Sequence, residues 1–329
     1  MRKMRSVPIY MHSDLAKGLV WLGVAIASWG AMFSVAKRTL PVLDAFFLGS
    51  VRYVFGALIF IAILWAVEGR QALRYGGRLL PATLFGLFGF CGFNLLVWWG
   101  LAFTRPEHAA IIMALQTPMT AIAVWLTQGK RPAPFTIGCV AVAIGGVLLV
   151  VTKGSLAGVF AGGSLLGDLL VFLGAVSWVV YTMAGWHFSG WSPLRMTVLT
   201  AIPGTAGLLL ANAAAIGLGF AELPSFAAVW SVKWQIGYFI VFTVVLGVLG
   251  FNNGVKHLGA LNTMLMLNLI PVIVFAIEAW LGRSYAPIEL AGAATVIGAL
   301  VANNFYLRGQ ARALGPHVPE SRRASSRVT

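Results

Sequence analysis

Long apolar stretches recur along this chain, and only short polar segments separate them. A helix needs about 20 apolar residues to cross the hydrocarbon core of a bilayer, so each stretch predicts a membrane-spanning helix. The ten predicted helices cover residues 15–38, 42–67, 79–103, 107–127, 133–152, 164–187, 193–217, 232–257, 260–281 and 286–307. The pattern therefore predicts an all-α membrane protein with ten transmembrane helices.

The composition supports this interpretation. The chain is 59% hydrophobic and only 10% charged, with a mean hydropathy of +0.88, whereas soluble domains carry about a quarter charged residues. Its basic start followed by an apolar run is similar to a signal peptide, but no small-residue cleavage site follows and the run is too long. We therefore expect this run to be the first span.

The net charge of +14 could indicate a nucleic-acid partner, but the Lys and Arg residues lie at the ends of the predicted spans. Most of them face the cytoplasm if the N-terminus is cytoplasmic, as the positive-inside rule requires. We therefore expect a membrane protein with both termini in the cytoplasm and no nucleic-acid partner. The cytoplasmic ends would be residues 1–14 and a basic, disordered tail, 308–329, that contacts membrane lipids.

The chain contains two related halves. "MALQTPM" at 113–119 aligns with "MLNLIPV" at 266–272, and "FNLLVWWG" at 93–100 aligns with "FNNGVKHLG" at 251–259. "ASWG" at 27–30 likewise resembles "VSWV" at 176–179. Since five spans per half is an odd number, the halves, 15–152 and 153–307, form an inverted-topology repeat.

The first half resembles the EamA repeat of the drug/metabolite transporter superfamily. The resemblance rests on the Trp-Gly in "GLVWLGVAIASWGAMFSVAKRTL", the Arg in "VRYVFGAL", the run into a mid-helix proline in "MALQTPM", and the glycines of "IGCVAVAIGGVLLV". It extends over residues 15–307 and is nearest to the bacterial aromatic amino acid exporters. One departure is that the acidic residue often present after helices four and nine is replaced by Lys130 or Arg131 and by Arg283 or Ser284.

Polar and aromatic side chains concentrate in helices one, three, four, six, eight and nine, where they predict a substrate cavity near the membrane midplane. Hydrogen bonding between helices and plain packing are the alternative roles. The candidate cavity residues are Trp29, Asn94, Trp98, Met113, Gln116, Trp178, Tyr181, Asn252, Met266 and Asn268.

Pro118 and Pro271 each free a backbone carbonyl one turn earlier, so we expect helices four and nine to bend there. Gly30 is a third candidate position for bending or gating. In the fifth and tenth helices, close packing is predicted at Gly138, Gly145, Gly292 and Gly298.

Arg52 is the one formal charge deep in a span. A tie to backbone carbonyls or to a neighbouring helix is the favoured interpretation, and substrate contact is the alternative. The carboxylates lie near helix ends, where capping is expected. Without a buried acid or histidine in mid-span, we expect transport by facilitation or exchange rather than proton coupling.

Enzyme and metal chemistry have no support, because H-E-x-x-H and G-x-S-x-G motifs are absent and Cys91 and Cys139 are isolated from each other. We expect no catalytic residue, no metal and no cofactor. The sequence thus predicts a monomeric exporter of aromatic or hydrophobic amino acids and related small metabolites that works by alternating access. The alternatives are a nucleotide-sugar or phosphorylated-metabolite exchanger and a non-transporting scaffold or lipid-handling protein.

Overall fold

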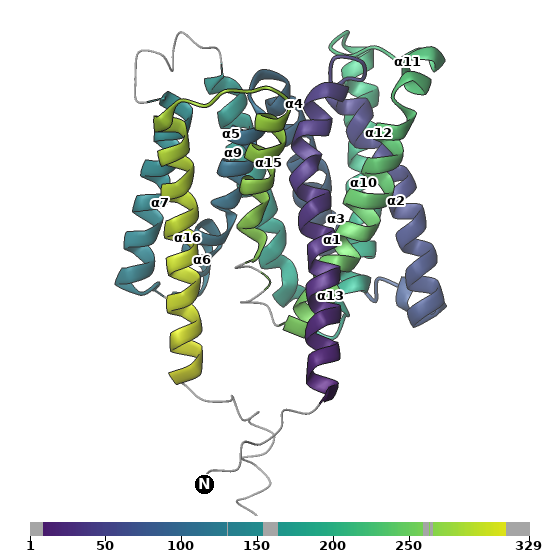
Figure 1. The fold of residues 1–329 in the computed structure, drawn as a ribbon. Coiled ribbons are helices and arrows are strands. Elements are labelled where there is room, and N and C mark those ends of the chain that lie inside the picture. The colour runs from purple at the N-terminus through teal and green to yellow at the C-terminus, as the bar shows by residue number, and fades with distance from the viewer. Residues whose placement is uncertain (1–8, 130, 154–163, 259–262, 264–265, 314–329) are drawn as a thin grey trace, which may run out of the picture.

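Helices that cross the molecule from one end to the other make up the computed structural model (Figure 1). It describes residues 9–129, 131–153, 164–258, 263 and 266–313. Within these residues, nine helices are long and apolar enough to span a membrane, and Leu269–Trp280 is a shorter apolar helix at the predicted ninth position. The chain is therefore an all-α, multi-pass membrane protein whose ten helices follow the predicted order.

Most predicted boundaries lie within a few residues of the observed ones. The first half contains α1 (Ile9–Thr39), α2 (Ala45–Glu68), the short η1 (Arg70–Leu73), a third span made of α3 (Leu79–Gly86), η2 (Leu87–Gly92) and α4 (Phe93–Phe103), then α5 (Pro106–Ala114), α6 (Gln116–Gln128) and α7 (Pro134–Thr152).

The second half repeats this order with additional short helices. It contains α9 (Leu165–Thr182), η3 (Met183–Phe188), α10 (Pro193–Gly217), α11 (Phe226–Ser231), an eighth span made of α12 (Lys233–Tyr238), η4 (Phe239–Leu246) and α13 (Gly247–Leu258), then α15 (Leu269–Trp280) and α16 (Pro287–Ala313).

The two halves are interleaved in space rather than placed side by side. The closest helix pairs are α7 with α16, α4 with α9, α1 with α13 and α2 with α10, and each pair joins one helix from each half. In Figure 1, α1 begins and α16 ends at the same end of the bundle, which we call the terminal end. We call the opposite end the distal end.

Two spans break at equivalent points. In the fourth span Leu115 lies between α5 and α6 at φ −68° and ψ −10°, and in the ninth span Asn268 precedes α15 at φ −63° and ψ −9°. Each break lies three residues before a proline, Pro118 or Pro271. Proline lacks the N–H that would bond the carbonyl one turn earlier, so the helix opens on that side.

The third and eighth spans also share an irregularity. Leu87–Gly92 and Phe239–Leu246 are π-helical, and each segment lies inside an otherwise α-helical span. Wide turns of this kind are frequent at functional sites because they re-aim the side chains around them. Both halves thus carry a π segment in their third helix and a break in their fourth.

Glycine allows close contact at two helix crossings. A Cβ atom on Gly30 would lie 2.6 Å from Cγ2 of Ile273, so Gly30 serves the approach of α1 to α15, while α1 itself continues unbroken through it. At the crossing of α7 and α16, a Cβ on Gly292 would lie 2.8 Å from the Gly146 carbonyl oxygen.

The expected close packing is wrong for three other glycines. A Cβ added at Gly138, Gly145 or Gly298 would meet no described atom within 4 Å. The tail expectation also changes, because α16 continues to Ala313. The remaining predicted tail, 314–329, and most of the predicted segment 1–14 lie outside the described residues.

Candidate functional site

The predicted cavity residues divide into two groups by exposure. Four are buried: Asn94, Trp98, Tyr181 and Asn268. Six are half-buried: Trp29, Met113, Gln116, Trp178, Asn252 and Met266. The half-buried side chains therefore keep some exposed surface, whereas the four buried ones have almost none.

Asn94 and Trp98 bond to each other within α4. The Asn94 amide donates to the Phe90 carbonyl at 2.6 Å, and its oxygen accepts from the Trp98 indole N–H at 3.1 Å. The hydrogen bonding of Asn94 is thus satisfied inside its own helix. Its role in this structure is to orient Trp98.

The other aromatic candidates pack against neighbouring helices. The Trp29 indole donates to the Thr243 carbonyl at 2.9 Å, which ties α1 to the π segment η4. The ring centroids of Trp178 and Phe93 are 5.0 Å apart, and those of Trp178 and Tyr181 are 5.1 Å apart. These rings form one wall between α4 and α9.

Three amides near the breaks have little hydrogen bonding. The Gln116 amide nitrogen has only the Met113 sulfur as partner, at 3.9 Å. The buried Asn268 Nδ2 has no acceptor within the described part of the chain, and Asn252 has no hydrogen bond to any described residue. Hydrogen bonding between helices, the alternative role for these amides, is therefore not observed among the described residues.

Arg52 is buried in an aromatic environment that we call the Arg52 box. Its side chain is 3% exposed, and its guanidinium carbon lies 4.8 Å from the ring centroids of both Tyr53 and Trp98 and 6.0 Å from that of Phe239. Nη1 contacts the Met32 sulfur at 3.7 Å, and Nη2 donates to the Tyr53 hydroxyl at 3.3 Å. No described carboxylate or backbone carbonyl accepts a hydrogen bond from this guanidinium. The expected tie to backbone carbonyls is therefore not observed among the described residues, but the rings of Trp98 and Phe239 do connect Arg52 to neighbouring helices.

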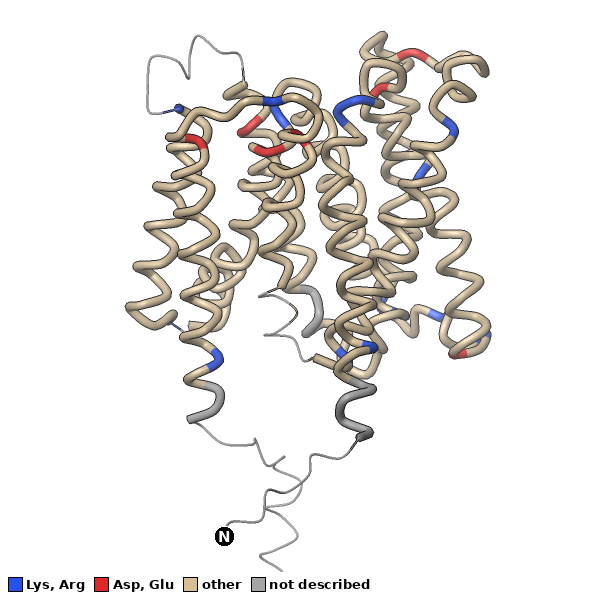
Figure 2. Tube along the Cα trace, in the orientation of Figure 1, with Lys and Arg blue, Asp and Glu red and all other residues tan. Residues whose placement is uncertain are grey.

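Ion pairs gather at the distal end, where they connect the two halves (Figure 2). Each of the following pairs joins an arginine, lysine or glutamate of residues 38–153 to a partner beyond residue 270, and we call the set the distal ion-pair layer. Its members are Arg38–Glu278 (2.9 Å), Arg105–Glu289 (3.3 Å), Lys153–Glu289 (3.6 Å) and Glu107–Arg283 (2.7 Å).

A second buried group lies beside this layer. His108 on α5 is 1% exposed and Asp168 on α9 is 5% exposed, and His108 Nδ1 lies 3.3 Å from both oxygens of Asp168. The Thr104 hydroxyl at the end of α4 donates to the same carboxylate. The group therefore joins α4, α5 and α9 across the boundary between the halves.

Tyr285 lies in the loop between α15 and α16, close to the carboxylates of the distal ion-pair layer. Burial raises the pKa of the Tyr285 hydroxyl, and the nearby Glu107 carboxylate raises it further. The hydroxyl therefore stays neutral, donates to the Phe275 carbonyl at 3.4 Å and packs its ring 4.8 Å from that of Phe275.

These geometries change the capping expected of the carboxylates. Asp44 does cap α2, because its side chain accepts from the Phe47 N–H at 2.9 Å. Glu107, Asp168 and Glu278, by contrast, bind cationic or hydroxyl partners on other helices. Glu107, His108 and Asp168 are buried, but they lie near span ends rather than in mid-span. Transport without proton coupling therefore stays a prediction.

Comparison with known sequences identifies the family. The sequence profile of the EamA-like transporter family matches the chain twice, over residues 16–152 and 165–305. The chain belongs to the EamA-like transporter family. Each match covers one five-helix half, in agreement with the inverted repeat.

Relatives and a solved structure agree with this assignment. Two proteins of Bacillus subtilis (strain 168), described as "Uncharacterized transporter YrdR" and "Uncharacterized transporter YyaM", are each 30% identical to this EamA-like transporter. YrdR aligns over 89% of this chain and 94% of its own, and YyaM over 87% and 92%. A crystal structure with 20% identity shares the fold at a TM-score of 0.62, covering 89% of this chain and 98% of that chain.

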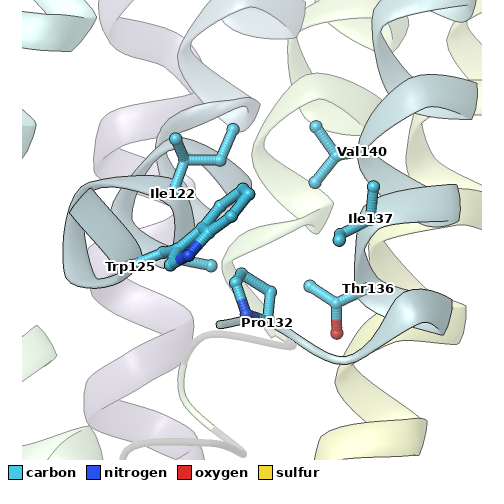
Figure 3. A pocket seen from close by; sticks show the side chains of 7 residues that line it. Ile122, Trp125, Pro132, Thr136, Ile137 and Val140 are labelled. Carbon is cyan, nitrogen blue, oxygen red and sulfur yellow. The ribbon is translucent and has the colours of Figure 1, made fainter. Parts of the chain in front are cut away.

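A pocket of about 130 Å³ in this EamA-like transporter lies away from the predicted cavity residues (Figure 3). It is lined by apolar side chains of α6 and α7, among them Ile122, Trp125 and Ile137, together with Thr136. Around this pocket α5 contacts both α7 and α9, whereas α6, past the break at Leu115, contacts α9 and has little contact with α7.

Sequence reasoning missed the distal ion-pair layer as a unit. In the sequence, Glu107, Asp168, Glu278 and Glu289 lie at the predicted span ends opposite the termini, as do several basic residues, but the carboxylates were interpreted only as helix caps. The available signal was that both signs of charge gather at the same span ends. Pairing them required knowing which helices are neighbours, and the interleaving of the halves decides that.

Proposed function

We propose that this EamA-like transporter exports aromatic and hydrophobic amino acids, and related small metabolites, across a bacterial inner membrane by alternating access. The observation that carries the proposal is the set of half-buried aromatic, thioether and amide side chains around the two breaks. Gln116, which contacts the Met113 sulfur at 3.9 Å, and Asn252 offer amide groups that described residues leave without a strong hydrogen bond. Such a surface suits a solute with one apolar and one polar part.

The positions of the ion pairs support alternating access. The distal ion-pair layer links the halves at one end of the bundle, while the breaks at Leu115 and Asn268 give α6 and the ninth span freedom at the other. Separating the halves at the distal end would require these pairs to open, so the layer acts as a gate. With both termini in the cytoplasm, this gate faces the periplasm and is closed here.

Anionic substrates with several phosphates fit less well. Polyphosphates need several Arg or Lys side chains around them, and Arg52 is the one buried Lys or Arg among the described residues. This observation disfavours the nucleotide-sugar alternative. A single buried cation suits a substrate with a single carboxylate, such as an amino acid.

Transport by purified protein tests the proposal. Liposomes that contain the protein as a monomer are loaded with labelled phenylalanine, tryptophan, leucine, alanine, glutamate and a nucleotide sugar in separate experiments. We expect release of the aromatic and hydrophobic amino acids above the rate of empty liposomes. Release of the nucleotide sugar alone would establish the alternative exchanger, and absence of flux for every solute would favour a scaffold or lipid-handling role.

A further inference from the structure

We propose that Arg52 binds the carboxylate of the transported solute, with the Arg52 box as its subsite. This assignment rests on the proposed function and adds to it a residue and a chemical group. Substrate contact, the alternative role of Arg52, is thereby favoured over a structural tie, because of what surrounds the guanidinium.

The charge of Arg52 has no carboxylate partner among the described residues. The ion pairs described above lie at the distal end, and none of them includes Arg52. Its hydrogen-bond acceptors are a thioether and a phenol, both neutral and weak, and its buried Nε has no acceptor among the described residues. A buried charge without a partner is costly, so an anion that can reach it is bound strongly.

The rings of Tyr53 and Trp98 lie against the guanidinium, and its Nε–Nη2 edge is the part available to an anion. Tyr53 and Trp98 lie against the guanidinium at equal centroid distances of 4.8 Å, which stabilises the cation through its faces. The Nε–Nη2 edge, in contrast, has only the Tyr53 hydroxyl at 3.3 Å. That edge carries two parallel N–H donors, the arrangement that binds a carboxylate through both oxygens.

The Arg52 box adjoins the half-buried wall of the candidate site. Met32, Trp98 and Phe239 belong to one buried cluster, against which Met113, Trp178 and Tyr238 pack from the less buried side. A solute whose carboxylate reached Arg52 would therefore place its side chain against Met113 and Trp178. This order of groups matches an amino acid with an aromatic or aliphatic side chain.

Both π segments, η2 and η4, contribute to the Arg52 box or to the residues that hold it. Phe239 is the first residue of η4, and Trp98 is held by Asn94, which lies two residues past the end of η2. The box is shut in this structure, with Arg52 only 3% exposed. An entering carboxylate replaces the thioether and the phenol as acceptor, and the two irregular segments are the backbone best able to adjust.

Equilibrium binding to the purified full-length protein tests the assignment without relying on transport. Two probes share a phenyl ring and a three-carbon chain, namely 3-phenylpropanoate, which has a carboxylate, and 3-phenylpropanamide, which has an uncharged amide in its place. Calorimetry should show that the wild-type protein binds the carboxylate at least about tenfold more tightly than the amide. Arg52→Gln should remove this preference by weakening the binding of the carboxylate about tenfold or more, with the binding of the amide unchanged.

The variants separate a binding role from a structural one. Arg70→Gln, a control at an exposed arginine of η1 outside both the Arg52 box and the distal ion-pair layer, should keep the preference for the carboxylate. If Arg52→Gln does not fold, Arg52→Lys decides, since it keeps the charge and loses the two-donor edge; an unchanged affinity for 3-phenylpropanoate would then overturn the assignment. Equal weakening of both probes by Arg52→Gln would likewise show that Arg52 only supports the structure.

The two proposals fail in different ways. Binding of 3-phenylpropanoate through Arg52, with no amino acid flux in liposomes, would sink the export proposal and keep the subsite. Amino acid flux inhibited equally by both probes, and unaffected by Arg52→Gln, would keep export and remove the subsite.

Discussion

Two classes of amide side chain in this membrane protein differ in what they bond. Gln116 and Asn252 are half-buried and, apart from a long contact to a sulfur, have no partner among the described residues, whereas Asn94 is buried and bonds to Phe90 and Trp98 within the third span. A membrane interior offers no water to unpaired amides unless a cavity supplies it. The two classes therefore predict opposite results on mutation.

Replacing the free amides should impair transport and spare stability. Gln116→Leu and Asn252→Leu remove groups that contribute little hydrogen bonding to the fold, so we expect unchanged or slightly raised melting temperatures and flux reduced at least about tenfold, the effect of losing about 1.4 kcal/mol of solute binding. Flux in liposomes and thermal unfolding in detergent check both parts. Normal flux in both variants would show that these amides lie outside the solute path.

Replacing the bonded amide should do the reverse. Asn94→Leu leaves the buried Trp98 indole N–H without an acceptor, which should lower the free energy of unfolding by about 1–2 kcal/mol. In the double variant Asn94→Leu/Trp98→Phe both partners are gone, so part of this loss should return. Chemical denaturation of the four proteins measures the coupling, and an additive result would contradict the bond.

At the scale of the elements, the helix breaks at Leu115 and Asn268 are the clearest shared feature of the halves. Pro118 leaves the Ala114 carbonyl without its usual N–H partner. Pro118→Ala restores the donor, so α5 and α6 should join into one straighter helix. We expect a more stable protein that transports several-fold more slowly, measured by thermal unfolding and by flux. Faster transport would show that the break is not needed for movement.

The elements were largely predictable from the sequence because apolar length and helix-breaking residues are local signals. Helices 79–103 and 193–217 agree with the prediction to the residue, and Pro118 and Pro271 indicated where the spans would open. The π segments η2 and η4 were not predictable, since nothing in their apolar sequences distinguishes a π turn from an α turn. The surroundings of Arg52 also remained hidden, because its rings come from three different spans.

At the scale of the whole molecule, the interleaved halves meet at the distal end through charge. Glu107 is fully buried against Arg283, whereas Lys153 is exposed and 3.6 Å from its partner. Removing one member of a buried pair is far more disruptive than weakening an exposed one. The two sites therefore provide a matched test of the gate.

We expect Glu107→Gln to favour the distally open state and Lys153→Gln to change little. A cysteine introduced at Leu281, near the gate, reports opening through its rate of reaction with a water-soluble maleimide, with Cys91 and Cys139 replaced by serine. The rate should rise several-fold in Glu107→Gln and stay within about twofold of the parent in Lys153→Gln. Equal rates in the two variants would argue against a gating role for the layer.

The repeat alignment gives the distal ion-pair layer one more consequence. The alignment of 113–119 with 266–272 places Glu278 over Trp125 and Glu289 over Thr136, and both of these counterparts line the apolar pocket of Figure 3. The positions that are equivalent to the distal ion-pair layer in the inverted repeat thus lie in an apolar contact. Ionic strength screens the first and not the second, so potassium chloride added only outside right-side-out vesicles should change the transport rate, while the same salt inside should not. The two ends of the molecule thus share a backbone arrangement but differ in side-chain chemistry. Each end should therefore respond differently to the salt concentration of the aqueous compartment that it faces.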